Sequence, residues 1–348
     1  MQKVTIIGWT DGFWKWLANF ILKNFRNEVN LTITWRNEEK WQKVAKELNC
    51  KFSSKTREVI TDSDITIFAV PIFYTTKIIK MYAPYLKFWS VVLDVTSIKK
   101  EPAEALEKYT PKWVLVIPTH PMFWPFVSSI AGQIFVLTPN DETKRDERYK
   151  KLKKFLEDSQ AKVIEETPEE HDKMMAVVQW LNHLNMFVLA DTMKRLNFDI
   201  KKSFNFVSPI YKIMVSSVGR YVSQNPKLYA DIQMNNSEVL NVHKEFMKSI
   251  SEFNNYVLEK DEESFIENIE KSKKYFADEA EKWQIYTDKI IFLLSKQIEK
   301  AQKAIWKEII LENIYTKEQK KSILKDFKDR KLFLDNWDVL ELDKWNIM

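Results

Sequence analysis

The chain of 348 residues carries 54 Lys and Arg against 49 Asp and Glu, which gives a net charge of +5. Its 45% hydrophobic and 14% aromatic residues exclude a disordered chain, and a content of only 4 Gly excludes a collagen-like or flexible linker sequence. The small, dispersed positive charge indicates no nucleic-acid partner, and no apolar run approaches the roughly 18–20 residues of a membrane span.

The single cysteine, Cys50, excludes a disulfide framework and a cysteine zinc cluster. It is typical of a reducing compartment, so we expect a cytoplasmic protein without a structural metal. The first residues, MQKVTIIGWTDG, lack the apolar core of a signal peptide and indicate a first strand.

The first half of the chain alternates short β-branched segments with segments of helical period. The predicted strands are Val4–Ile7, Leu31–Thr34, Ile65–Val70, Val91–Val95, Val114–Pro118, Ile134–Thr138 and Lys162–Ile164. The predicted helices between them include Lys15–Phe25, Glu38–Leu48 and Thr75–Leu86. This order predicts an α/β Rossmann-type domain over residues 1–166, with a parallel sheet that binds ligands beyond the carboxyl ends of its strands.

The pattern changes at Thr167–Pro168, after which the helical period dominates. The predicted helices are Met174–Leu196, Ser203–Val222, Glu238–Leu258, Asp261–Trp283 and Thr287–Trp306. Apolar helices of this kind need a partner, so residues 167–305 are expected to form an all-α domain that binds substrate and makes a homodimer. Residues 306–348 form a tail of unknown role, in which we expect a peripheral helix at Lys317–Lys331 followed by a solvated end.

The first strand runs into a short glycine-containing turn, where a dinucleotide-binding fold places the pyrophosphate on the following helix N-terminus. An ordinary β–α turn would have the same two glycines. The second strand ends at Arg36, and an arginine there suits a 2′-phosphate, which favours NADP over NAD. Candidate cofactor-binding residues at this strand edge are Gly8, Thr10, Asp11, Gly12, Phe13, Arg36, Val70, Pro71 and Thr96.

Two polar segments, Asp94–Lys99 and Ile117–Pro125, directly follow neighbouring strands. Because parallel strands end at the same sheet edge, Ser97 and His120 can converge near the cofactor. A histidine beside a nicotinamide is a candidate base, since its pKa lies near neutrality.

Five motifs together resemble the prephenate dehydrogenase family, whose members also include arogenate dehydrogenases. They are DVTSIK (94–99), PTHPMF (118–123), EHDKMM (170–175), SPIY (208–211) and GRYVSQNPKLYADIQM (219–234). The resemblance extends to about residue 300. It implies oxidative decarboxylation of prephenate or arogenate, to 4-hydroxyphenylpyruvate or tyrosine, with hydride transfer to NADP or NAD.

The resemblance also implies roles for individual residues. His120 matches the catalytic histidine that accepts the proton of the ring hydroxyl, and Ser97 the serine that holds that hydroxyl. Arg220 matches the arginine that binds a substrate carboxylate, and Gln179, His183 and Gln224 are expected on the substrate side. We expect His171 to start or cap the long helix and His243 to lie at the surface.

Tryptophans depart from the family pattern in a systematic way. They stand where relatives have glycine at Trp9, Trp14, Trp35, Trp41, Trp89, Trp113, Trp124 and Trp180, whereas Trp16 matches a family tryptophan. A bulky residue is hostile to a tight phosphate turn, and an indole at position 14 is expected to push the helix off the sheet. Some genetic codes read UGA as glycine and others as tryptophan. We therefore hypothesise that many of these tryptophans are glycine codons translated under the wrong code.

Two other functions are consistent with the residues alone. One is a different NADP-linked reductase on a similar scaffold, against which the set Ser97, His120 and Arg220 argues. The other is a non-catalytic nucleotide-binding dimer, which is favoured only if the tryptophans are genuine.

Overall fold

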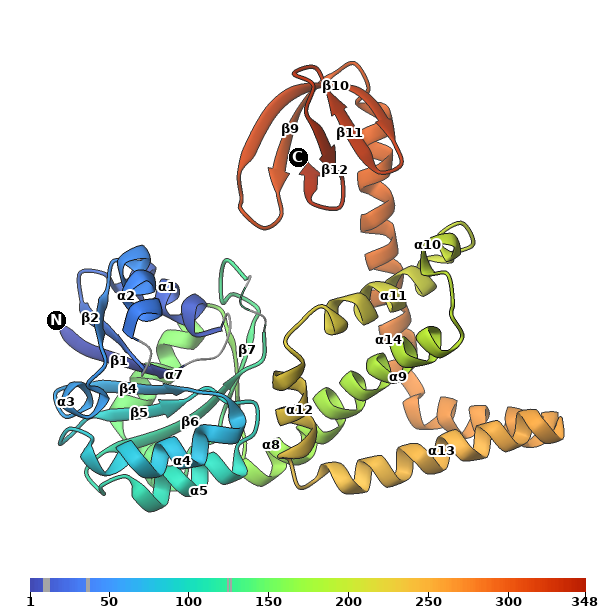
Figure 1. Cartoon of the computed structure of the whole chain (residues 1–348). Helices are drawn as coiled ribbons and strands as arrows, with labels where there is room; N and C mark the ends of the chain where they lie inside the picture. Colours follow the sequence, from blue (N-terminus) through green and yellow to red (C-terminus); the bar gives the residue numbers. More distant parts are fainter. Residues whose placement is uncertain (9–12, 36–37, 124, 126) are drawn as a thin grey trace. The chain divides into compact units, whose positions relative to one another are not determined.

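The computed structural model describes residues 1–8, 13–35, 38–123, 125 and 127–348 (Figure 1). Predicted site residues Thr10, Asp11, Gly12 and Arg36 lie outside these ranges, as do Trp9 and Trp124. The chain divides into two compact units, Met1–Lys248 and Ser249–Met348, and each is described by itself.

The first unit is built on an eight-stranded sheet of order β3-β2-β1-β4-β5-β6-β7-β8. The strands are β1 (Gln2–Gly8), β2 (Val29–Thr34), β3 (Lys51–Ser53), β4 (Ile65–Ala69), β5 (Val91–Asp94), β6 (Leu115–Pro121), β7 (Ile134–Leu137) and β8 (Lys162–Glu165). The predicted Rossmann-type sheet is confirmed, with β3 as an additional strand. The prediction that all strands of this sheet are parallel was wrong at one strand, since β7 runs antiparallel to β6.

Helices cover both faces of this sheet because alternate strand residues are apolar on each side (Figure 1). On one face, α1 (Phe13–Phe25), α2 (Glu38–Leu48) and α7 (Glu147–Asp158) pack on residues such as Ile6 and Ile117. On the other, α3 (Thr56–Ile60), α4 (Ile72–Tyr82) and α5 (Lys100–Tyr109) pack on residues such as Ile7 and Phe68. Short helices η1 (Ala83–Tyr85) and α6 (Asp141–Arg145) lie in the connections.

The strand order reverses between β1 and β4, which is the switch point where such sheets bind nucleotides. Gly8 ends β1 opposite Ala69 of β4. A Cβ at Gly8 would lie 2.1 Å from the Ala69 carbonyl oxygen, so only glycine lets the two strands approach there.

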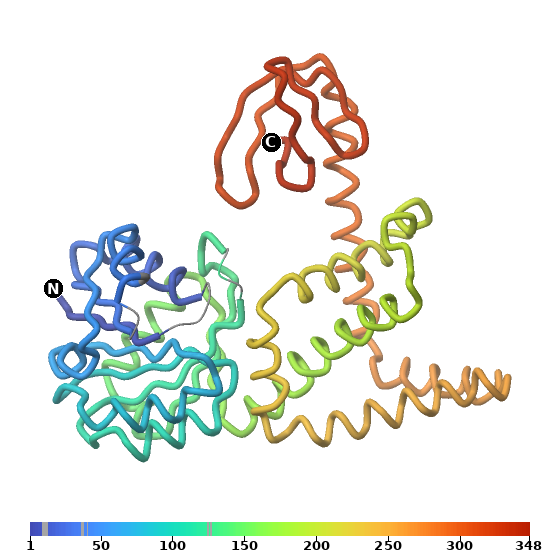
Figure 2. Tube along the Cα trace, viewed as in Figure 1, coloured from blue at the N-terminus to red at the C-terminus, as the bar shows by residue number. Residues whose placement is uncertain are grey.

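The helical part of the first unit begins at Pro168, where the Thr167 hydroxyl caps α8 (Pro168–Met175) by accepting from the Glu170 N–H at 3.1 Å. The long predicted helix is three consecutive elements, α8, the π-helical η2 (Ala176–Leu181) and α9 (Asn182–Arg195). It is followed by α10 (Ile200–Ser203), α11 (Pro209–Val222), α12 (Pro226–Met234) and the start of α13 (Val239–Glu259), which continues into the second unit. Helices α9 and α11 pack side by side (Figure 2).

The second unit contains α14 (Glu262–Lys303) and a five-stranded antiparallel sheet of order β12-β11-β10-β9-β13. Its strands are β9 (Glu308–Asn313), β10 (Gln319–Lys328), β11 (Lys331–Leu334), β12 (Val339–Glu341) and β13 (Trp345–Ile347). The expected break after Trp283 is absent, and the non-helical backbone lies at Ala277 instead. No helix in the described ranges is both long and apolar enough to cross a bilayer.

The expectation of a peripheral helix and a solvated end beyond residue 306 was therefore wrong. The apolar residues of the tail alternate, so that Leu311, Leu324, Leu332 and Leu334 all face one buried cluster that includes Ala301 of α14. Alternation of this kind is a strand pattern with one covered face.

Among the tryptophans that the structure describes, three have a left-handed backbone, namely Trp89 (φ 68°), Trp306 (φ 64°) and Trp337 (φ 67°). Trp89 is the third residue of a turn closed by the Ser90 N–H on the Lys87 carbonyl at 3.2 Å, which is the glycine position of a type II turn. Large side chains rarely adopt this conformation. The backbone at these three positions is one that suits glycine.

Other tryptophans are packed into buried clusters. Trp14 and Trp41 lie in the core between α1, α2 and the sheet, with ring centroids 4.4 Å apart. The expectation that an indole at position 14 would push the helix off the sheet was wrong, because α1 still packs on β1 and β2. Trp180 is buried beside Val239, and the Trp16 indole N–H donates to the Val127 carbonyl at 2.8 Å.

Candidate active site

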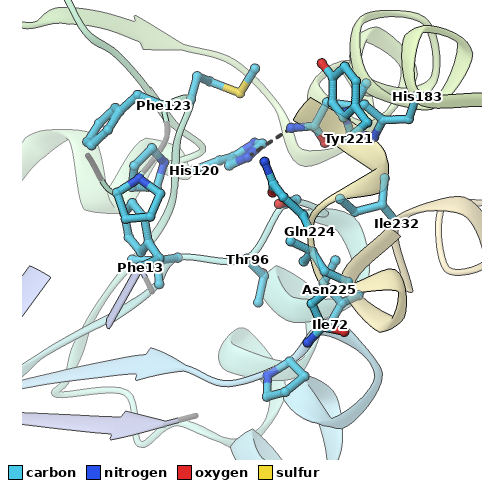
Figure 3. Close-up of a pocket in the computed structure, with 18 of the residues that line it drawn as sticks. Phe13, Ile72, Thr96, His120, Phe123, His183, Tyr221, Gln224, Asn225 and Ile232 are labelled. Atoms are coloured by element: carbon cyan, nitrogen blue, oxygen red, sulfur yellow. Dashed lines mark hydrogen bonds between the residues drawn. The ribbon is translucent and has the colours of Figure 1, made fainter. Parts of the chain in front are cut away.

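A cavity of about 550 Å³ lies in the first unit between the carboxyl ends of the sheet strands and the helices that follow α8. Figure 3 shows Phe13, Thr96 and His120 on the sheet side of this cavity, facing His183 and Gln224 on the helical side. The strand order and the cavity thus place one pocket beside the switch point of the sheet.

The cavity collects most of the residues predicted from the sequence. Its lining includes Phe13, Val70, Pro71, Thr96, Ser97, His120, Gln179, His183, Arg220 and Gln224. These residues come from six separate segments, so their convergence is produced by the fold. Gly8 lies at the end of β1 and is not among the lining residues.

His120 ends up buried because it lies within β6, where its neighbours on both sides are strands. Its ring is 3% exposed, and its Nε2 lies 3.4 Å from the Nε2 of Gln179 at the cavity wall. Burial holds the pKa of His120 well below its usual 6.5, and the neighbouring His171 and Lys99 lower it further. His120 is therefore neutral at physiological pH and can accept a proton.

The segment after β5 is held in place by a buried ion pair. Lys99 and Asp94 are both fully buried and bonded to each other, and Lys99 Nζ also donates to the Thr96 hydroxyl at 3.2 Å. Burial lowers the pKa of Lys99 although the Asp94 carboxylate acts in the opposite direction. The pair closes the loop on itself and presents Ser97 to the cavity.

On the helical side, an aromatic group surrounds His183 of α9. Its ring centroid lies 4.9 Å from that of Tyr221 and 5.0 Å from that of Tyr229. Burial lowers the pKa of His183 to about 4. Gln224 accepts a hydrogen bond from the Tyr229 hydroxyl at 3.1 Å, which orients its amide at the cavity. Arg220 of α11 adds a guanidinium to the lining.

Sequence reasoning missed two residues of the site. We expected His171 to start or cap its helix, but Thr167 is the cap and the ring of His171 contacts His120. Asp172 is also buried beside the site, bonded to His171. The signal was available, since EHDKMM contains a histidine and an acid in adjacent positions, but nothing in their spacing showed that they face another strand. His243 lies at the surface as expected.

A doubly wound sheet whose switch point opens on a cavity with a neutral, buried histidine is the arrangement of a nucleotide-dependent dehydrogenase. Two family models match the chain: "Prephenate dehydrogenase, nucleotide-binding domain" over residues 21–165 and "Prephenate dehydrogenase, dimerization domain" over residues 167–271. The chain belongs to the prephenate dehydrogenase family.

Curated relatives agree with this assignment. A probable arogenate/prephenate dehydrogenase of Methanocaldococcus jannaschii is 41% identical over 332 residues, which cover 95% of this chain and 74% of the relative. The T-protein of Haemophilus influenzae is 30% identical over 226 residues, covering 65% of this chain and 58% of the relative. The first similarity includes most of the second unit, which the family models leave largely unmatched.

Solved structures show the same fold. Prephenate dehydrogenase from A. aeolicus in complex with hydroxyphenyl propionate and NAD+ aligns with a TM-score of 0.62 at 22% identity, over 79% of this chain and 97% of that one. Synechocystis arogenate dehydrogenase aligns with a TM-score of 0.56 at 19% identity, over 78% of this chain and 98% of that one.

Proposed function

We propose that this protein oxidatively decarboxylates prephenate or arogenate, with hydride transfer to a nicotinamide nucleotide. The observation that carries the proposal is the position of His120, a neutral base buried at the cavity beside the switch point. Membership of the family and the curated relatives support the same activity. Loss of carbon dioxide aromatises the substrate ring, which drives the reaction.

Different residues of the chain have different roles in this reaction. His120 accepts the proton of the ring hydroxyl while the ring carbon that bears this hydroxyl loses hydride. Ser97 holds that hydroxyl from the loop after β5, and the ion pair between Lys99 and Asp94 keeps this loop in place. Arg220 binds a substrate carboxylate with its planar guanidinium fork, and Gln179, His183 and Gln224 line the substrate side.

The cavity fits a nicotinamide nucleotide on its sheet side. Gly8 ends β1 where an added Cβ would meet the Ala69 carbonyl, and Phe13, Val70, Pro71 and Thr96 follow at the same edge. The bound nucleotide supplies the hydride acceptor. We propose NADP as the preferred form because Arg36 follows β2, where a 2′-phosphate would lie, with Thr10, Asp11 and Gly12 in the phosphate turn. Replacing Arg36 by Glu should then shift preference toward NAD.

We propose that residues 167–305 form the homodimer as well as the substrate wall, while residues 1–166 hold the nucleotide. Large apolar side chains stay exposed on helices of the first unit and on the turns between them, including Val188, Leu196, Phe206 and Ile210. Exposed apolar area of this kind is typical of an interface. With no helix among the described residues suited to a membrane, a single Cys and biosynthetic relatives, we place the protein in the cytoplasm.

We also propose that the native chain has glycine at Trp89, Trp306 and Trp337. Their left-handed backbone supports this. Trp89 is one of the eight positions named from the sequence, whereas Trp306 and Trp337 are two further positions. The buried packing of Trp14, Trp41 and Trp180 gives no such backbone support. The genomic codons decide the matter, because UGG at these positions would contradict the proposal.

The activity is tested on protein translated in its native code and on the chain as written. Each is mixed with NAD or NADP and with prephenate or arogenate, and nicotinamide reduction is followed by absorbance. We expect substrate-dependent reduction by the native protein. Failure of the natively translated protein with both substrates and both nucleotides would contradict the proposed function.

A further inference from the structure

A chain of buried hydrogen bonds leads away from the cavity behind His120. The His120 Nδ1 lies 2.9 Å from the His171 Nε2, and the His171 Nδ1 lies 2.7 Å from a carboxylate oxygen of Asp172. The three residues are 3%, 2% and 4% exposed, so water does not compete for these bonds. His120 comes from β6, whereas His171 and Asp172 come from α8.

Asp172 accepts from backbone as well. The same oxygen that bonds His171 accepts from the Lys99 N–H at 2.7 Å, and the other oxygen accepts from the Lys100 N–H at 2.9 Å. These N–H groups form the N-terminus of α5, where the helix dipole favours a negative charge. Both backbone contacts come from N–H groups, which can only donate, so each oxygen of Asp172 acts as an acceptor.

The positions of the protons follow from this end of the chain. Because Asp172 only accepts, the His171 Nδ1 carries the proton and the His171 Nε2 is an acceptor. His120 must then donate from its Nδ1, which leaves the His120 Nε2 unprotonated. That nitrogen is the one near Gln179 at the cavity, where its amide N–H can donate to it at 3.4 Å.

We propose that His171 and Asp172 are positioning residues that fix the tautomer of His120. The proposal rests on the proposed function, in which His120 is the base. When His120 takes a proton on Nε2, its Nδ1–H strengthens its bond to His171, and the Asp172 carboxylate lies at the far end of the chain. Other charges near His120 are the Lys99 ammonium and its partner Asp94, and Arg220 lines the same cavity.

The variant that tests this is Asp172→Asn. The asparagine keeps the size of the side chain, but its amide N–H₂ can donate to His171, which reverses both histidine tautomers and places a proton on the His120 Nε2. An asparagine in the corresponding place of a serine-protease triad, a worked example of the same principle, lowers kcat by about 10⁴. We expect kcat to fall by about 10²–10⁴-fold, with KM and nucleotide affinity little changed.

The matched control is Asn236→Ala. The Asn236 side chain donates to the Asp172 backbone carbonyl at 2.7 Å, so its loss disturbs the same helix without entering the chain of protons. A second variant, His171→Gln, offers an oxygen to the His120 Nδ1–H but separates it from Asp172. We expect it to keep the His120 tautomer, with a kcat between those of the unaltered protein and Asp172→Asn.

Nitrogen NMR of histidine-labelled protein reads the tautomers without any turnover. The chain has 4 His, and single replacements of His183 and His243 assign the remaining two. We expect Nδ1–H tautomers for both His120 and His171 in the unaltered protein and Nε2–H tautomers in Asp172→Asn. A proton on the His120 Nε2 of the unaltered protein would overturn the proposal, whatever the variants do.

The outcomes separate this proposal from the function it rests on. If the tautomers reverse as expected but no nicotinamide reduction occurs in any protein, the function fails and the proton arrangement stands. If Asp172→Asn is only destabilised like Asn236→Ala, with unchanged tautomers and kcat, Asp172 is a structural cap of α5 and the positioning role is wrong.

Discussion

Replacement of Trp337 by glycine is a direct test of whether the tryptophans belong to the native chain. Trp337 lies in the hairpin between β11 and β12, where its N–H donates to the Leu334 carbonyl at 3.3 Å. The Leu334 N–H in turn donates to the Asp338 carbonyl at 2.9 Å. A turn followed by a left-handed residue is a common three-residue hairpin, and that residue is normally glycine.

The magnitude follows from the backbone and from what the indole contacts. Holding a side-chain-bearing residue in the left-handed region costs about 1–2 kcal/mol, and the added freedom of glycine in the unfolded chain opposes this by about 0.4–1 kcal/mol. The Trp337 side chain is 93% exposed, so almost no burial is lost with it. The net expectation is a gain in unfolding free energy of roughly 0.5–1 kcal/mol.

Replacement of Trp89 or Trp306 is a less sensitive test because a cationic side chain lies over each of these indole rings. The Arg148 guanidinium lies 4.7 Å from the Trp89 ring centroid, and Lys325 Nζ lies 4.6 Å from that of Trp306. An exposed contact of this type contributes about 0.5–1 kcal/mol. Its loss would offset most of the backbone gain.

Denaturant unfolding of the full chain, followed by circular dichroism, measures the effect. The matched control is Trp283→Gly, because Trp283 is also exposed but lies within α14. Glycine there should lower stability by about 0.5 kcal/mol, since it is the poorer helix former. If both variants are destabilised equally, the left-handed backbone at Trp337 is not a glycine position and the reasoning fails.

The remaining predictions concern the site. His120→Asn should lower kcat by about 10²–10⁴-fold with unchanged nucleotide affinity, and wild-type rates in steady-state assays would remove its role as base. Since neutral His120 is the active form and its pKa lies below 6.5, kcat/KM should stay level from neutrality down to that pH and fall only in more acidic buffer; a fall centred above 6.5 would contradict this. Arg220→Ala should mainly raise KM, and an effect on kcat alone would argue against carboxylate binding. Because the pKa of His183 falls to about 4 on folding, stability is complete above 6.5 and is lost as the pH falls toward 4, so His183→Phe should flatten the pH dependence of Tm over that range. Lys99→Met should cost about 3–5 kcal/mol in unfolding free energy by leaving the Asp94 carboxylate buried without its partner, and adding Asp94→Asn should recover part of it.

The nucleotide-binding sheet was predictable because buried parallel strands are short apolar runs between helical periods. The direction of β7 was predicted wrongly, although the sequence held a signal against a parallel neighbour. A parallel neighbour requires a long crossover, usually a helix, and the described residues between Pro121 and Ile134 contain none. Whether a strand runs parallel or antiparallel to its neighbour depends on the connection before it. The four residues of β7 have a pattern that suits both directions.

The second sheet was missed for a different reason. Its strands carry many charges on the exposed face, and β10 alone contains four lysines, so the basic run suggested a solvated helix. The turns were also concealed, because Trp337 stands after Asp335 and Asn336, where glycine would have indicated a hairpin. Without the glycine that would mark the turn, the strands on both sides of it are also difficult to predict from the sequence.

Of the site, the residues at strand ends were predictable, because topology alone brings Ser97 and His120 to one edge. The role of His171 was not predictable in this way. Its contact with His120 depends on how α8 seats against the sheet, and only a residue-level structure shows which nitrogen meets which.

The boundary between the two matched family models, at residue 166, has a consequence for how this chain can be divided. It separates His120 from His171 and Asp172, so the hydrogen bonds behind His120 cross from one matched segment to the next. A fragment ending at residue 166 would keep the strand that holds His120 but would lack the acceptor for its Nδ1–H. The segment that matches the nucleotide-binding model is thus separate in sequence, but the buried hydrogen bonds of its histidine form only when the helix after the boundary is seated against it.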